Sequence, residues 1–189
     1  MIKLKNIAAV QTGYTFRTRL ESLPTGSVAV IQMKDLSGDR VDCSRLLRTE
    51  IDELKDNHRV RLGDLVFRSR GTVTTSAILL DDTGEAVVSA PLLRIRVTDE
   101  HCLPQYLNWF INQPPAQAFL ASHAKGTAQQ MISKEALDDM DIPLPSMEHQ
   151  RTIVELAALS EKEQSLMNTL SGKRKQLVST QLMTLTKEA

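Results

Sequence analysis

The sequence has few aromatic residues and no excess of either charge. Aromatic side chains make up 4% of its 189 residues, so a core has to be mostly aliphatic, and the 41% hydrophobic content can supply one. Lys and Arg number 23, as do Asp and Glu, which gives a formal net charge of zero. A protein that coats nucleic acid by charge alone is usually basic. The balance therefore argues against a non-specific coat, although a local basic patch is compatible with it.

Other absences bear on the location of the protein. No run of about 18 apolar residues occurs, so no membrane span is expected. The stretch from Met1 to Lys5 lacks the long apolar region of a signal peptide. Cys43 and Cys102 are not spaced as metal ligands and are expected to be free thiols. These features predict a cytoplasmic protein.

Motifs of common enzyme classes are also missing. The chain has no GxxxxGK phosphate loop and no GxGxxG dinucleotide loop. It has no Gly-x-Ser-x-Gly nucleophile elbow. The histidines at positions 58, 101, 123 and 149 have no partner at metal-ligand spacing. We therefore expect no catalytic centre, no metal and no cofactor.

The segments that are present predict an α+β fold. Expected strands are rich in β-branched residues, and expected helices fall in a separate part of the chain. The strands are expected at Val28–Gln32, Leu65–Phe67 and Leu92–Val97, with a hairpin joining Val73–Leu80 to Ala86–Val88; helices are expected after Pro104, Pro114 and Ser133. The strand at Leu92–Val97 alternates in polarity and is expected to be half-exposed. We predict a mixed or antiparallel sheet with short helices in residues 1–145.

Three polar loops are candidates for ligand binding. Tyr14 to Arg17 either ends a strand with one ring in the core or presents Tyr14 and Arg17 to a ligand. Arg68 to Thr72 holds the densest set of donors suited to phosphates and base edges, although arginines in turns are commonly just solvated. Arg59 and Arg61 lie upstream and are expected to extend that patch. Lys125 to Gln130 offers an amine, a hydroxyl and amides.

The tail, residues 146–189, predicts one long helix. Pro143 and Pro145 stop any helix before it, and Ser146 is a good N-cap. Leucines at 156, 159, 166, 170 and 177 follow coiled-coil spacing, with Glu163 and Lys173 in the two seam positions that lack leucine. The alternative is a terminal helix packed on its own domain. A bend or break is expected at Ser171-Gly172.

The charges of this seam favour an antiparallel pair of identical helices. Folding the pattern about Asn168 brings Glu163 opposite Lys173, whereas a parallel pair would stack like charges. We therefore predict a homodimer. Its dimerisation residues are Leu156, Leu159, Glu163, Leu166, Leu170, Lys173 and Leu177.

Several motifs in fixed order resemble one family. They are Gly13-Tyr14-x-Phe16-Arg17, Gly63-Asp64-Leu65-Val66-Phe67-Arg68-Ser69-Arg70-Gly71, Gly126-Thr127, Ile132-Ser133-Lys134-Glu135-x-Leu137, Ile142-Pro143-Leu144-Pro145 and Gln150-x-x-Ile153-Val154. In this order and spacing they resemble the specificity subunits of type I restriction–modification enzymes over the whole chain.

The resemblance implies a non-catalytic target recognition domain that binds double-stranded DNA, followed by a helical spacer. Family members usually carry two such units, with antiparallel helices between them and methyltransferase subunits alongside, with or without a restriction subunit. This chain departs from the pattern by carrying one unit, as a half-size subunit or a fragment would. The expected DNA-contacting residues are Tyr14, Arg17, Lys34, Arg68, Ser69, Arg70, Thr72, Lys125, Thr127, Gln129 and Gln130. The alternative is a protein-interaction or assembly module that acts through the helical arm.

Overall fold

The computed structural model describes residues 1–17, 20–23, 25–71, 74–126 and 130–186. The chain divides into two compact units, Met1–Arg151 and Thr152–Ala189. The first unit contains the sheets and short helices, and the second is helical. The predicted α+β class with a long C-terminal helix is confirmed.

A mixed sheet forms the centre of the first unit. In spatial order its six strands are β2 (Ala8–Thr12), β10 (Leu93–Val97), β7 (Leu65–Phe67), β8 (Ser76–Ile78), β5 (Arg40–Val41) and β4 (Leu36–Ser37). Strands β5 and β8 are parallel, and the other neighbours are antiparallel. Thr12, Leu93 and Phe67 lie in one row, with Ser76 opposite Phe67. Strands β2 and β7 therefore end where β10 and β8 begin, and we name this edge the loop end of the sheet.

A smaller sheet packs on the central one. Its strands are β6 (Leu47–Thr49), β3 (Val28–Ile31) and β9 (Ala86–Val88), with β3 antiparallel to β6 and parallel to β9. Both sheets contribute to a cluster of buried aliphatic side chains that includes Ile31, Val66 and Val88. Burying one such side chain fully stabilises the fold by about 1.5–3 kcal/mol. This core agrees with the low aromatic content of the sequence.

The predicted hairpin between Val73–Leu80 and Ala86–Val88 is wrong. Strand β8 pairs with β7 and β5, whereas β9 pairs with β3 in the other sheet. The turn itself exists, since Gly84 N donates to Asp82 Oδ1 at 2.9 Å. It carries the chain from one sheet to the other, because β9 forms a parallel pair that no local turn can specify.

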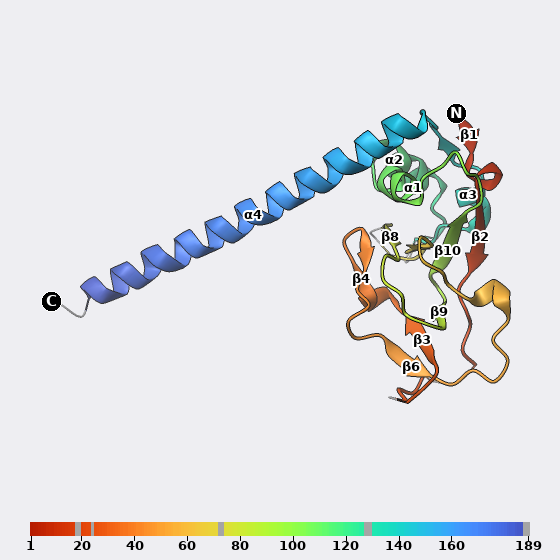
Figure 1. The fold of residues 1–189 in the computed structure, drawn as a ribbon, viewed down its shortest axis with the longest axis horizontal. Coiled ribbons are helices and arrows are strands. Elements are labelled where there is room, and N and C mark those ends of the chain that lie inside the picture. The colour runs from red at the N-terminus through yellow and green to blue at the C-terminus, as the bar shows by residue number, and fades with distance from the viewer. Residues whose placement is uncertain (18–19, 24, 72–73, 127–129, 187–189) are drawn as a thin grey trace. The chain divides into compact units, whose positions relative to one another are not determined.

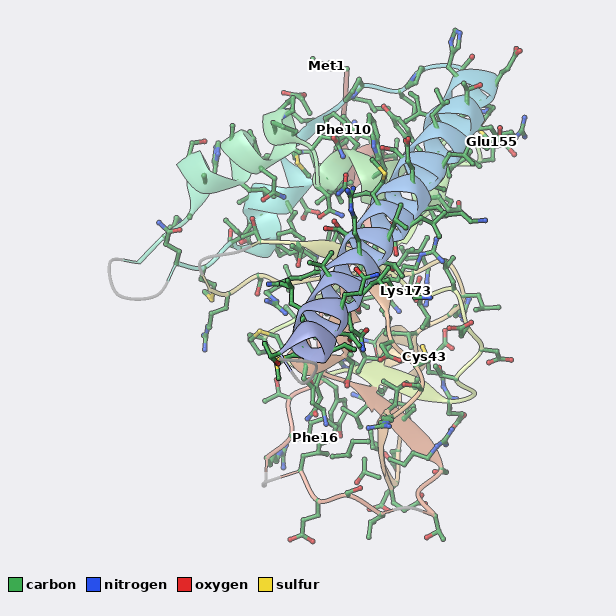
Figure 2. The ribbon with its side chains drawn as sticks, turned by 90° about the vertical axis from the view of Figure 1, so that its left-hand side faces the viewer. Met1, Phe16, Cys43, Phe110, Glu155 and Lys173 are labelled. Atoms are coloured by element: carbon green, nitrogen blue, oxygen red, sulfur yellow. The ribbon has the colours of Figure 1, made fainter. Side chains whose placement is uncertain are left out.

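Three helices gather away from β3, β6 and β9 (Figure 1). They are α1 (Pro104–Ile111), α2 (Pro114–His123) and α3 (Lys134–Asp138). Helix α1 packs against β8, and α3 packs against β2. Ser133 caps α3 as predicted, because its Oγ accepts from Ala136 N at 3.2 Å. Figure 2 shows Phe16, which follows β2, at the end of this unit far from Met1 and Phe110.

Short elements complete the first unit. The 3₁₀ helices are η1 (Leu4–Asn6), η2 (Met33–Asp35) and η3 (Asp56–His58). Strand β1 (Ile2–Lys3) pairs with β11 (Asp141–Ile142), so that the first and last strands of the unit lie side by side. Helix α4 (Met147–Leu185) then begins, and Ser146 Oγ accepts from His149 N at 3.4 Å, which confirms the predicted cap.

Helix α4 is continuous through Ser171 and Gly172, so the predicted bend or break there is wrong. One glycine lowers helix propensity by only about 1 kcal/mol, and the favourable residues around it sustain the helix. The five seam leucines are 58–65% exposed. Among the described residues, no helix combines the length and apolar character needed to cross a membrane.

Candidate nucleic-acid interface

The second and third predicted loops meet at Met131. Met131 N donates to Lys125 O at 2.9 Å, and Met131 forms β-bridges with both Arg70 and Lys125. Gly71 N donates to Gln130 O at 3.1 Å. Two loops separated by more than fifty residues in sequence therefore form one continuous surface beyond the end of β7.

Glycine makes the backbone of both loops possible. Gly71 has φ +116° and Gly126 has φ +107°, a region that side chains with a Cβ rarely adopt. At Gly71 an added Cβ would meet open space, so conformation rather than crowding favours glycine there.

The side chains of these loops differ in accessibility. Arg70, Lys125 and Gln130 are exposed, with the Arg70 Nη2 at 3.7 Å from Met131 Sδ. Arg68 is half-buried, and its Nη2 donates to Met33 O at 3.0 Å. Exposed guanidinium, ammonium and amide groups can reach phosphates and base edges, whereas Arg68 is already engaged by the fold.

Ser69 has to be removed from the predicted DNA-contacting set. Its side chain is 3% exposed, and its hydroxyl donates to the carbonyl of Pro91. Its carbonyl also accepts from Ile132 N at 2.7 Å. Ser69 thus joins the second loop to Pro91 on one side and to Ile132 on the other. Thr72, Thr127 and Gln129 lie outside the described residues.

Lys34 lies beside this surface. It is exposed in η2, which follows β3. The turn is fixed because Asp35 Oδ2 accepts from Gln32 N at 2.8 Å, and the Arg68 contact to Met33 joins it to the second loop. Burial raises the pKa of Asp35, against the lowering effect of its bond to Gln32.

The Tyr14–Arg17 loop packs its two rings against the core and leaves Arg17 exposed. The Tyr14 ring is half-buried and packs with Phe16, at 4.8 Å between ring centroids, on the outer face of β3 and β9. Arg17 is exposed. Gly13 allows this loop to approach, since a Cβ there would lie 2.7 Å from the backbone carbon of Ser89.

This loop also belongs to the loop end of the sheet. Ala90 N donates to Tyr14 O at 2.9 Å, and the next residue, Pro91, accepts the Ser69 hydroxyl. Residues 90 and 91 therefore join the first loop to the second by hydrogen bonds, and the second loop is joined to the third by the bond from Gly71 N to Gln130 O.

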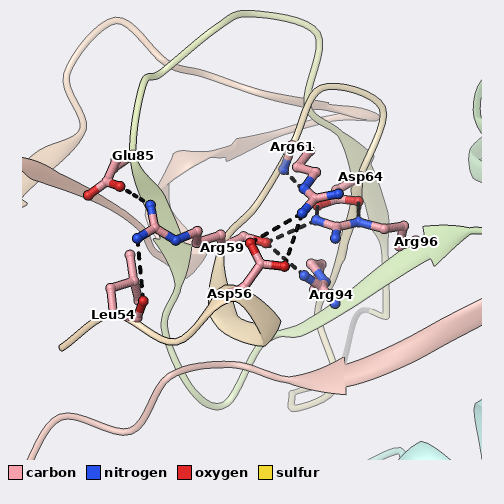
Figure 3. Close-up of polar contacts among 8 residues, drawn as sticks. All are labelled: Leu54, Asp56, Arg59, Arg61, Asp64, Glu85, Arg94 and Arg96. Carbon is pink, nitrogen blue, oxygen red and sulfur yellow. Dashed lines mark hydrogen bonds and ion pairs between the residues drawn. The ribbon is translucent and has the colours of Figure 1, made fainter.

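Arg59 and Arg61 do not extend the patch as predicted. Arg59 pairs with Glu85, and Arg61 Nη2 lies 3.0 Å from Asp56 Oδ2 (Figure 3). Because each guanidinium already has a carboxylate partner, neither is an uncommitted donor for phosphate.

Two further arginines of β10 complete the ion-pair network around Asp64 (Figure 3). Arg96 donates to Asp64 through Nε at 2.7 Å and Nη2 at 2.6 Å. Arg94 and Arg96 donate to Arg59 O at 2.7 and 2.9 Å. Burial, with help from Arg96, lowers the pKa of Arg94, whereas the hydrogen bonds to Asp64 raise the pKa of Arg96. The expectation of a half-exposed strand is wrong at Arg94, which is buried.

Sequence reasoning missed Lys55 and His58, which face Tyr14. An open pocket of about 480 Å³, which we name the Tyr14 pocket, is lined by Thr12, Gly13, Tyr14, Thr15, Arg17, Glu53, Lys55 and His58. The rings of Tyr14 and His58 meet edge to face, with centroids 5.4 Å apart. Within the described part of the chain, no cluster of three or more His, Cys, Asp or Glu residues could hold a metal ion.

Residues 1–174 match the family described as the type I restriction modification DNA specificity domain, and the chain belongs to that family. Specificity subunits of these systems are non-catalytic DNA-recognition proteins. The resemblance found in the sequence is thereby confirmed.

Comparisons with individual proteins point to the same family. The chain is 26% identical over 129 residues to the type I restriction enzyme EcoBI specificity subunit of Escherichia coli, which covers 67% of this chain and 27% of that protein. It is similar to a chain solved in work on complex assembly and conformational transition of the type I R-M system (TM-score 0.64, 17% identity, 87% of this chain and 38% of that one).

It is also similar to the HsdS subunit from Thermoanaerobacter tengcongensis (TM-score 0.62, 19% identity, 87% of this chain and 37% of that one). At these identities the structural likeness concerns the fold. The chain spans about a quarter of the length of the curated relative that it matches.

Proposed function

We propose that this chain recognises a specific DNA sequence, without catalysis of its own, through the loop end of its central sheet. The observation that carries the proposal is the set of exposed Arg17, Arg70, Lys125 and Gln130 on three linked loops, with Lys34 exposed on η2 beside them, in a member of the specificity family. These side chains supply charge for phosphates and planar donors for bases. A local patch of this kind is compatible with zero net charge.

Within this surface we assign Arg70 to base reading. It is exposed, and a guanidinium can donate to both acceptors of guanine. Gln130 can pair with adenine, and Lys125 and Lys34 suit phosphates. Arg68 has the role of holding the loop, because its guanidinium is half-buried and bonded to Met33 O.

Competition binding with single-base variants of the target, at two salt concentrations, tests the assignment. Arg70→Ala should cost about 1–3 kcal/mol at one base position and relax specificity there. Lys125→Ala should weaken binding to all sequences and lower the salt slope by about one ion. If both variants remain folded and bind as tightly and selectively as wild type, this loop is not the reading surface.

We further propose an antiparallel homodimer through α4. Its support is the row of leucines that remain 58–65% exposed along the helix, since a contiguous apolar surface of this kind is typical of an interface. The pseudo-symmetry about Asn168 would place each Glu163 near the partner's Lys173. The exposed Met167 and Leu182 would widen the apolar contact beyond the leucine row.

Charge reversal tests the orientation. Exposed ion pairs contribute about 0.2–1 kcal/mol each, so Lys173→Glu, which turns two attractive pairs into repulsive ones, should weaken the dimer roughly tenfold. Adding Glu163→Lys in the same chain should restore it. Sedimentation at tens of micromolar provides the measurement. A strictly monomeric wild type contradicts the dimer, and a double variant weaker than the single one contradicts the antiparallel pairing.

A two-fold dimer of identical reading units would recognise an inverted repeat split by a spacer, because protein symmetry is mirrored in the site. One added heptad lengthens the helix by about 10 Å, equal to about three base pairs of DNA. Methylome sequencing of a host with the complete system would reveal the motif. A single unsplit, asymmetric motif would refute this part of the proposal.

Partners follow from the same proposal. We propose that methyltransferase subunits, with or without a restriction subunit, assemble on this chain and are positioned by it on DNA. The exposed leucine row also favours a second candidate, an assembly module that acts through α4. Sequence-specific DNA binding, by the chain alone or with its methyltransferase, supports the first, and helix-mediated binding without DNA recognition supports the second.

A further inference from the structure

We infer that the Tyr14 pocket binds a phosphate group of the DNA backbone, next to the base-reading loops, with Lys55 and Arg17 as its cations. This inference rests on the proposed DNA recognition and adds Lys55, which lies outside the loops predicted from sequence. The pocket lies directly after β2, at the loop end of the sheet. Tyr14 O accepts from Ala90 N, and the next residue, Pro91, accepts the hydroxyl of Ser69, which precedes Arg70.

The lining chemistry suits an anion. Lys55 and Arg17 are exposed cations on opposite walls, and neither has a carboxylate partner among the described contacts. Thr12 and Thr15 contribute hydroxyls, which commonly contact phosphates. His58 Nδ1 is buried without a hydrogen-bond partner among the described residues, so the pocket wall holds an unused polar atom. Glu53 is the opposing charge on the rim.

The aromatic rings favour phosphate over a stacked base. Tyr14 contacts His58 edge to face at 5.4 Å and Phe16 at 4.8 Å. Its ring also packs into the cluster around Val30 and Val87. Base stacking needs a free aromatic face, and these rings are already engaged with one another and with the core.

Both walls of the pocket are fixed before any ligand arrives. Gly13 brings one wall against Ser89, with no room for a Cβ. The other wall is held at Arg59, whose Nη2 donates to Leu54 O at 3.4 Å and whose carbonyl receives Arg94 and Arg96. The Asp64 network therefore positions the segment that carries Lys55 and His58. Rigid walls reduce the entropy lost on binding.

Fluorescence anisotropy over a salt series tests the inference on the full chain, with its methyltransferase if the complex is needed for binding. Lys55→Ala should lower the slope of log affinity against log salt by about 0.9. Its affinity deficit should therefore shrink about three- to fourfold between 50 and 200 mM salt, while the preference among single-base variants stays unchanged. Arg17→Ala should show the same lower salt slope and the same unchanged base preference.

Two further variants sharpen the test. Glu53→Gln removes the negative charge of the rim and should tighten binding roughly two- to fivefold. Lys5→Ala is a control for the loss of one lysine charge elsewhere on the unit, because Lys5 lies on η1, before β2, and is already paired with Asp139 at 3.0 Å. Its salt slope should equal that of wild type. Thermal unfolding checks that each variant is folded.

The DNA can identify the contacted phosphate. Duplexes with one neutral methylphosphonate at successive positions should include one that weakens wild type but not Lys55→Ala. Finding that position, with the lower salt slope, supports the inference.

If wild type binds its target specifically and the Lys55 and Arg17 variants keep the full salt slope, the pocket is not a phosphate site, although the proposed function stands. A changed base preference in Lys55→Ala overturns the inference in favour of a base contact. Absence of specific binding by wild type, with and without its methyltransferase, overturns both.

Discussion

Gln150 offers a sharp test of how the first turn of α4 is held within the Met1–Arg151 unit. Its side chain is fully buried. Its Nε2 donates to His101 O at 2.7 Å and to Pro145 O at 2.9 Å, and its Oε1 accepts from Leu103 N at 2.8 Å. The Gln150 amide is therefore hydrogen-bonded to three backbone groups, two just before α1 and one just before α4.

The expected cost of Gln150→Ala follows from these three bonds. At about 1 kcal/mol each, their loss should lower the free energy of unfolding by about 3 kcal/mol. For a chain of this size that corresponds to a Tm lower by about 6–12 °C. Gln150→Met keeps most of the volume but loses the same bonds, so it should recover only the packing part.

Thermal and urea unfolding measure the effect. Gln164→Ala is the matched control on the same helix, since that side chain is exposed and bonds only to Asn168 among the described contacts. Its stability should change by less than about 0.5 kcal/mol. If Gln150→Ala melts within about 2 °C of wild type, the three bonds do not fix the start of α4 and the reasoning fails.

Three other predictions concern the first unit. Asp64→Ala leaves Arg96 unpaired and should cost about 3–5 kcal/mol in urea unfolding; a loss below about 1 kcal/mol would show that the buried pair is dispensable. Gly13→Ala forces a Cβ against backbone and should lower Tm more than Gly38→Ala. At Gly38 the Cβ meets open space, and the cost is about 1–2 kcal/mol of left-handed strain. A larger loss of Tm for Gly38→Ala would contradict the close approach at Gly13. Burial raises the pKa of Cys102 to about 11, so at pH 8 about one thiol in 1,000 is ionised, and maleimide should label half-buried Cys43 first. Because the folded pKa exceeds the ordinary 9.0, unfolding releases this proton at alkaline pH, and stability should fall as the pH rises from about 9 to about 11; equal labelling of both thiols, or no loss of stability over that range, would contradict the burial argument.

Local chemistry was sufficient to predict most of the helices and strands. Ser133 and Ser146 cap helices in the structure, and the prolines at 104 and 114 begin them, because these signals act within one turn. The partner of β9 could not be predicted, because a parallel pair between distant segments leaves no local signal. The same holds for the continuity of α4 at Gly172, where the neighbouring residues outweigh one weak helix former.

For the candidate site, sequence reasoning selected the loops but not their contacts. Exposed Arg70 and Lys125 lie together because Met131 bridges them, which no spacing indicates. Arg61 pairs with Asp56 five residues away, which could have been suspected, whereas Arg59 pairs with Glu85, which is remote in sequence. Charge alone could not distinguish a free arginine from one already paired.

The pairing of β1 with β11 gives the first unit the properties of an exchangeable cassette. Ile2 lies opposite Ile142, so the first strand of the unit lies beside the strand from which the chain runs into α4. A whole unit of this kind, with the first turn of α4 up to Arg151, can be exchanged without changing the rest of that helix. On the proposed function, replacing the unit would change the DNA target while the rest of α4 is retained.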